Sequence, residues 1–222
     1  MRASIALATL ATLIAGSIAA PLESRDFLNA ITCDGQGITG TLVVRNPDQS
    51  THVASFIRGD SDSEGRIKLT TKYNGTPNPS NSKFVFQVCT SAAYIYGRRE
   101  EQTLTGFLTP YFHQNKAVTV GNQTSSGGQK YEPTYSLVSD VQASDKFTDT
   151  TLRQWFHLYN NGSFYSLAYT GREGGNTAGF AYGPVSRKAG DSIFVEMKYQ
   201  SDGQLNYDGF VNPFGYALEL HP

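Results

Sequence analysis

The sequence predicts an all-β fold, organised as a single domain over residues 33–222. Short segments alternate apolar and polar side chains with a period of two, which is the pattern of half-buried strands. No segment after the N-terminus carries a sustained apolar stripe at 3.6-residue spacing, so helices are expected to be absent or limited to short turns. Glycine, proline, asparagine, aspartate and serine separate the segments, as in domains built from antiparallel hairpins.

The clearest alternation is found in residues 66–73, 83–89 and 192–199. Every second side chain of such a strand points to the same face of its sheet. The side chains expected to face the core are Ile67, Leu69, Thr71 and Tyr73, then Phe84, Phe86 and Val88, then Ile193, Val195, Met197 and Tyr199. On the first segment, Lys68, Thr70 and Lys72 are expected to face outward.

The other expected strands are shorter or less regular. They cover residues 40–45, 52–58, 104–112, 116–120, 135–139, 152–159, 163–169 and 178–182, with one or two more between Leu205 and Leu220. Tight turns are predicted where Asn-Gly or Asp-Gly supplies a positive φ, at Asn74, Asn161, Asp202 and Asp208. About a dozen short strands in one domain fit a β-trefoil, a β-sandwich or another antiparallel barrel.

Internal repetition favours the first of these architectures. Residues 84–89 (FVFQVC), 152–156 (LRQWF) and 194–198 (FVEMK) align with Gln87, Gln154 and Glu196 in register. Three loosely similar units follow from this alignment, although their spacing along the chain is uneven.

A family resemblance rests on the order of several short motifs. An N-terminal signal is followed by Cys33, a GTLVV strand, an FxFQxC strand, a KAVTVGN strand and a QWF strand. This order resembles the fungal small secreted proteins of ricin B-like, β-trefoil type, over most of the mature chain. The resemblance implies a β-trefoil fold and makes carbohydrate the leading ligand class. The Gln-x-Trp signature of trefoil lectins occurs only in degenerate form, at residues 87–89, 154–156 and 196–198, so the resemblance supports the fold more than sugar binding.

The N-terminus has the features of a secretory signal peptide. Arg2 precedes an apolar run of Ala, Leu, Ile and Thr that ends in small residues, and the run is too short for a membrane anchor. Cleavage is expected after Ala19, which gives a signal peptide of residues 1–19 and a secreted, extracellular product. Residues 20–32 are interpreted as a propeptide or an N-terminal arm.

Export exposes the chain to oxidation and to glycosyltransferases. The two cysteines, Cys33 and Cys89, are therefore expected to form a disulfide. Sequons predict N-glycosylation at Asn74, Asn122 and Asn161.

Composition and motif content argue against several classes of function. The formal net charge of −1 gives no general attraction to nucleic acid or anionic lipid, so neither nucleic-acid binding nor membrane insertion is expected. No activated nucleophile, nucleotide-binding loop or zinc spacing is found, and no catalytic residue, metal or cofactor is predicted. His157 is interpreted as a structural histidine. The acidic loop at residues 58–65 resembles only half of a calcium loop, and a solvated hairpin tip is the favoured interpretation.

Aromatic residues are the remaining positive feature, with 13 Tyr, 13 Phe and one Trp. In residues 206–216, Tyr207 is positioned to stack on a sugar while Asp208 and Asn212 bind its hydroxyls. The plainer and favoured interpretation is that Asp208-Gly209 forms a turn and the nearby aromatic residues close the core.

The sequence thus favours a secreted, non-catalytic binding module whose ligand is an extracellular glycan. A secreted effector or hydrolase inhibitor is the alternative, with residues 74–82 inserting into a partner protein. A glycoside hydrolase is the third hypothesis, and it would need two facing carboxylates among Glu100, Glu101, Glu132, Asp140 and Asp208.

Overall fold

The computed structural model describes residues 31–61, 66–71, 79–91, 103–113, 115–121, 131–138, 153–169, 182–189, 191–199 and 215–222. The strands in these ranges are β1 (Ile31–Arg45), β2 (Thr51–Val53), β3 (Ser55–Ser61), β4 (Ile67–Thr70), β5 (Lys83–Ser91), β6 (Thr103–Pro110), β7 (Lys116–Val120), β8 (Tyr131–Val138), β9 (Trp155–Asn160), β10 (Tyr165–Tyr169), β11 (Tyr182–Ala189), β12 (Ser192–Tyr199) and β13 (Ala217–His221). One 3-10 turn, η1 (Pro79–Ser82), is the only helical element within these ranges. The all-β class is therefore confirmed.

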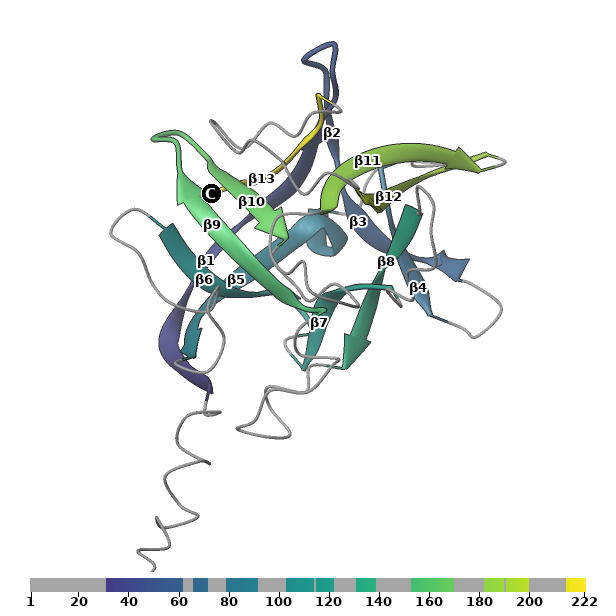
Figure 1. Ribbon diagram of the computed structural model, residues 1–222. Coiled ribbons are helices and arrows are strands. Elements are labelled where there is room, and N and C mark those ends of the chain that lie inside the picture. The colour runs from purple at the N-terminus through teal and green to yellow at the C-terminus, as the bar shows by residue number, and fades with distance from the viewer. Residues whose placement is uncertain are drawn as a thin grey trace, which may run out of the picture.

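Six antiparallel strands close a barrel (Figure 1). They follow one another around it in the order β1, β5, β6, β9, β10 and β13, and β13 then pairs with β1. In this closing pair Val44 lies opposite Leu218, so the seam joins the first and last described strands. Closure leaves no free edge among these six strands, which is how a barrel protects its backbone groups.

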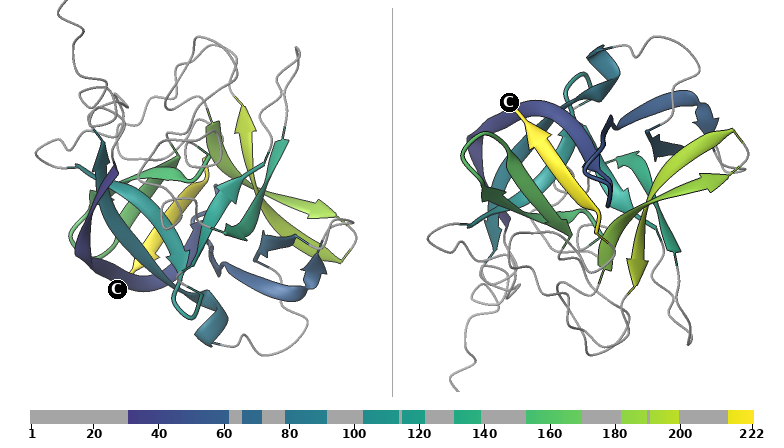
Figure 2. Two further views of the ribbon diagram at one scale, coloured as in Figure 1. Left: turned by 90° about the horizontal axis from the view of Figure 1, so that it is seen from below. Right: turned by 90° about the horizontal axis from the view of Figure 1, so that it is seen from above.

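β2 pairs with β1 at the edge of the barrel, and the other six strands form three hairpins beside it. β3 pairs with β4, β7 with β8, and β11 with β12, all antiparallel. The second strands of the hairpins also pair with one another, through Lys68↔Tyr135 for β4 and β8, Phe194↔Thr70 for β12 and β4, and Glu196↔Pro133 for β12 and β8. Figure 2 shows the barrel strands gathered on one side and these hairpins on the other.

The chain repeats one order of elements three times: a barrel strand, a hairpin, and a second barrel strand. The units run from β1 to β5, from β6 to β9, and from β10 to β13. The repeat alignment made from the sequence is therefore wrong in its third member. β5 and β9 end the first two units, whereas residues 194–198 belong to hairpin strand β12, and the equivalent barrel strand is β13. Any half-buried strand alternates with a period of two, so this pattern does not distinguish strands in different places.

A single large apolar core fills the barrel and extends under the hairpins. Phe84, Phe86 and Val88 are buried on β5, as the alternation predicts. Leu69 on β4, with Val195 and Met197 on β12, is buried as well. Full burial of such a side chain contributes about 1.5–3 kcal/mol, so this core is the main source of stability.

The prediction that Thr70 faces outward, with the other polar side chains of residues 66–73, is wrong. Thr70 is fully buried, and its hydroxyl donates a 2.8 Å hydrogen bond to the carbonyl of Ile193. Thr71 is buried as predicted, whereas Ile67 and Ile193 are only half-buried. β4 has strand neighbours on both sides, β3 on one and β12 and β8 on the other, so two adjacent threonines can both be enclosed.

Most predicted strands that fall on described residues lie within a few residues of their observed bounds. The single strand predicted at residues 52–58 is wrong, because these residues form two strands, β2 and β3, in different sheets, and residues 178–181 of another prediction lie outside the described residues. Two more differences have clear reasons. β1 begins at Ile31, well before residue 40, because its first residues pair with the end of β5 around the cysteines. Ile31 and Thr32, assigned from the sequence to the N-terminal arm, therefore belong to this strand. β11 was not predicted, because Gly183 and Pro184 are typical of turns. It is an edge strand that pairs only with β12 within the described residues, and proline is tolerated at such an edge.

Candidate ligand-binding site

The sugar-binding residues predicted from the sequence, Tyr207, Asp208 and Asn212, lie outside the described residues. The signal peptide and the sequons at Asn74 and Asn122 lie outside them too. Of the aromatic residues expected to close the core near the C-terminus, Tyr216 is described, and it packs half-buried against the main apolar cluster.

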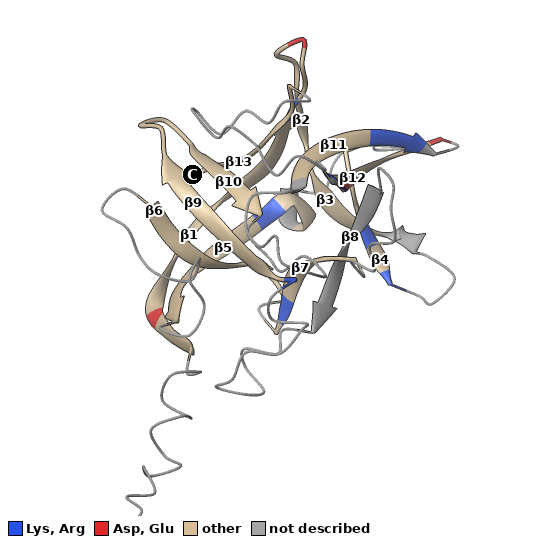
Figure 3. Ribbon diagram, viewed as in Figure 1, with Lys and Arg blue, Asp and Glu red and all other residues tan. Residues whose placement is uncertain are grey.

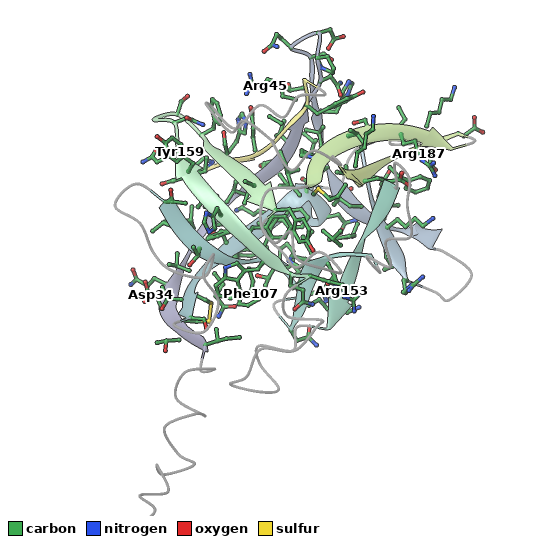
Figure 4. All side chains as sticks on the ribbon, viewed as in Figure 1. Asp34, Arg45, Phe107, Arg153, Tyr159 and Arg187 are labelled. Carbon is green, nitrogen blue, oxygen red and sulfur yellow. A yellow bond between two sulfur atoms is a disulfide. The ribbon has the colours of Figure 1, made fainter. Side chains whose placement is uncertain are left out.

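The disulfide between Cys33 and Cys89 is confirmed. The two residues are opposite one another in the β1–β5 ladder, and the register shifts between Cys33 and Gly37. Cys89 is buried in a second small cluster with Phe107 and Trp155, whose rings meet edge to face at 4.6 Å. Figure 4 labels Phe107 and Asp34 at this end of the barrel. The disulfide therefore secures the first residues of β1 over these rings.

Asn161 lies exposed in the turn between β9 and β10. The positive φ expected of the Asn-Gly turn is found at Gly162, where φ is 89°. The Asn161 side-chain amide donates to the Ser166 hydroxyl at 2.5 Å, and its backbone amide donates to Phe164. The side chain is thus accessible, and its orientation is set by the turn.

A short turn after β6 carries the most exposed aromatic side chains that the structure describes. We call residues 110–113 the aromatic turn. The amide of Tyr111 donates to the carbonyl of Lys83 at 2.9 Å, and the amide of His113 donates to Pro110 at 3.0 Å. The amide of Lys116 in turn donates to His113 at 2.8 Å. Backbone hydrogen bonds on both sides therefore fix the turn to the start of β5 and to β7.

The two aromatic rings of this turn face solvent. Tyr111 is 38% exposed and Phe112 is 59% exposed, and among the side chains that the structure describes no other large hydrophobic one is exposed. Their ring centroids are 4.9 Å apart with an interplanar angle of 79°. The Lys83 amine lies 5.2 Å from the centroid of the Tyr111 ring, within the range of a cation–π contact. The rings are thus oriented by each other, by the amine and by the backbone before any ligand binds.

Sequence reasoning missed this turn because residues 104–112 were assigned to one strand. The available signal was Pro110, which has no amide hydrogen to donate to a ladder and is followed by two adjacent aromatic residues and a histidine. β6 ends at Pro110, opposite Phe84, and the chain turns away from the barrel there.

A second polar group lies at the seam of the barrel, where β1 meets β13. The buried carboxylate of Glu219 accepts from Arg45 Nε at 2.6 Å and contacts His221 Nε2 at 2.8 Å. The Phe164 ring stacks on the His221 ring, with centroids 5.3 Å apart. The Arg45 guanidinium carbon lies 5.9 Å from the centroid of the Phe164 ring. Each carboxylate oxygen has a nitrogen partner, so this group is best explained as a link between strands.

Glu196 on β12 is the other buried carboxylate among the described side chains. Burial raises the pKa of Glu196, and the nearby positive charges of Arg187 and Lys68 oppose that rise. Arg187 Nε lies 2.7 Å from Glu196 Oε2, and its side chain is half exposed (Figure 4). Glu196 and Glu219 lie on a hairpin strand and a barrel strand, each with its own arginine.

Glycosidase chemistry requires two carboxylates that face each other, and the described carboxylates do not supply such a pair. The carboxylates proposed from the sequence for this role have no described side chains: Glu132 is on β8, and Glu100, Glu101, Asp140 and Asp208 lie outside the described residues. His157 is buried on β9, in accordance with a structural role.

Comparisons with known proteins do not assign the chain to a family. The sequence matches no protein-family model, and no curated protein shows significant similarity to it. Within the ranges described above, no group of His, Cys, Asp and Glu side chains could hold a metal ion. No helix found there has the length and apolar character needed to cross a bilayer.

Proposed function

We propose that this protein is a secreted, non-catalytic binding module of β-trefoil type, and that the aromatic turn binds carbohydrate. The threefold order of barrel strand, hairpin and barrel strand supports the trefoil, as does the mutual pairing of β4, β8 and β12. A trefoil has a barrel of six strands and three capping hairpins, and the closed six-strand barrel with three hairpins beside it supports this assignment, with β2 as an addition to that plan. The resemblance to ricin B-like secreted proteins points to the same fold.

The exposed ring pair Tyr111 and Phe112 is the observation that carries the binding proposal. Exposing large aromatic surface to water is unfavourable, so a rigid exposed pair is typical of a binding site. An aromatic face can stack against the C–H groups of a pyranose ring, and the backbone hydrogen bonds of the turn reduce the entropy lost on binding.

A glycan array probed with the secreted protein, followed by titration calorimetry on the best saccharide, tests this function. Phe112→Ala and Tyr111→Ala should each weaken binding by about tenfold, which corresponds to about 1.4 kcal/mol of lost stacking. Tyr159→Ala is the control: this tyrosine is half-buried on β9, outside the aromatic turn, and its loss should leave affinity unchanged. Unfolding curves confirm that each variant is folded.

The same array separates the competing hypotheses. Binding that is lost in Asp208→Ala but retained in both aromatic-turn variants would refute the role of the turn and return the site to residues 206–216. An array without any bound glycan would refute carbohydrate binding and favour a protein partner. Hydrolysis of a polysaccharide panel would refute a non-catalytic role.

A further inference from the structure

Three basic residues lie in the aromatic turn or directly beside it. Lys83 is exposed, and its amine lies beside the Tyr111 ring. His113 is exposed within the turn, and Lys116 follows it at the start of β7. The backbone hydrogen bonds that bind Tyr111 to Lys83 and Lys116 to His113 fix these three residues relative to the rings.

Among the side chains that the structure describes, no acidic one balances them in the segments that adjoin the turn. η1 has the neutral sequence PSNS, the opening residues of β5 are Lys-Phe-Val, and Lys83 is opposite Thr41 of β1. The described acidic positions lie elsewhere. Figure 3 shows them on β1, in the turn between β1 and β2 and at the tip of the β11–β12 hairpin, and the two buried glutamates are on β12 and β13. The turn is thus locally basic in a protein whose formal net charge is −1.

We infer that the ligand of the aromatic turn is an anionic saccharide, with a sugar ring stacked on the exposed rings and a carboxylate or sulfate group bound by Lys83. This inference rests on the proposed carbohydrate-binding function. The amine is already oriented by the Tyr111 ring, and an ammonium group has three N–H donors, so it can contact the ring and an anion together. The charge beside the rings selects among sugars, while the rings supply stacking common to all of them.

Matched saccharide pairs test the inference by titration calorimetry. Oligogalacturonate is compared with its neutral methyl ester, and dextran sulfate with dextran. The anionic member of at least one pair should bind more tightly, and its affinity should fall as NaCl rises from about 50 to about 300 mM, because salt screens exposed charges. The pair that responds identifies the anion as carboxylate or sulfate.

Lys83→Gln should weaken binding of the anionic saccharide about fivefold more than it weakens binding of the neutral partner, as expected for the loss of one exposed charge contact. Lys83→Arg should restore most of the loss. Lys188→Gln, which removes an exposed lysine from β11, is the matched control and should have no effect.

The outcomes distinguish this inference from the function on which it rests. One outcome would refute the anionic ligand and retain carbohydrate binding. In it, the charged and neutral saccharides of a pair bind equally, and this binding is lost in Phe112→Ala but unchanged in Lys83→Gln. Anionic binding within twofold of wild type in Lys83→Gln would also refute it. Binding of no saccharide of either kind would refute both.

Discussion

Removal of the Cys33–Cys89 disulfide should destabilise the protein strongly while the rest of the fold is retained. The perturbation is the double variant Cys33→Ala/Cys89→Ala, which avoids placing a hydroxyl at the buried position 89. The cysteines are 56 residues apart, so their link closes a long loop in the unfolded chain. In the chain-entropy model a loop of this length contributes about 4 kcal/mol.

Loss of packing adds to this figure. Cys89 is 1% exposed and belongs to the cluster of Phe107 and Trp155, so truncation to alanine leaves a small void there, at about 1 kcal/mol. For a domain of this size, each kcal/mol corresponds to a shift of about 2–4 °C in Tm. The double variant should therefore melt about 10–20 °C below the wild type.

The assay compares urea unfolding of the oxidised wild type, the reduced wild type and the alanine variant. Trp155 is the single tryptophan and lies in the cluster beside the disulfide, so its fluorescence reports on this end of the barrel. Amide exchange should accelerate at residues 31–33, which pair only with β5 in the described ladders. It should accelerate much less at residues 43–45, which pair with both β2 and β13. A loss of stability below about 1 kcal/mol in a folded variant would refute the reasoning.

Two further substitutions test the packing of individual residues. Burial raises the pKa of Glu196 in the folded protein above its ordinary value of 4.5. The folded state therefore binds this proton more tightly than the unfolded state, and the wild type should lose stability as the pH rises from about 4.5 through the raised pKa. Glu196→Gln removes this loss: its unfolding free energy should match the wild type near pH 3.5 and exceed it near pH 7, and parallel pH curves would contradict the shift. Gly106 has φ of 153°, and an added Cβ would lie 1.9 Å from the carbonyl oxygen of Gln87. Gly106→Ala should therefore cost about 3 kcal/mol or more in thermal or urea unfolding, and a loss below about 1 kcal/mol would show that β5 and β6 can separate there.

Local pattern was sufficient to predict much of the strand content. Phe84, Phe86 and Val88 are buried as the alternation requires, and the Asn161-Gly162 turn has its positive φ. The disulfide pairing followed from the cysteine count and the predicted export. The burial pattern and the turn depend on residues that are neighbours in the sequence. The disulfide needs no further information, because each cysteine has only one other cysteine to pair with.

The candidate site was less accessible to sequence reasoning. The sequence contains many aromatic residues, and nothing in it marks Tyr111 and Phe112 as the exposed ones. Their exposure depends on the direction in which the chain leaves β6. The nearness of Lys83 to Tyr111 depends on the pairing of β5 with β6. The burial of Glu196 and the inward side chain of Thr70 likewise depend on strands that are distant in sequence.

By itself, then, the sequence determined an all-β chain with one cross-link and an alternating apolar core, because period-two burial and turn chemistry act over a few residues. Tertiary structure alone decided that β13 returns to close the barrel against β1, and that one aromatic turn stays outside the core. The physical reason is that strand order and exposure depend on pairing between segments such as Arg45 and Glu219, which are 174 residues apart. No local pattern encodes which of many similar strands will meet.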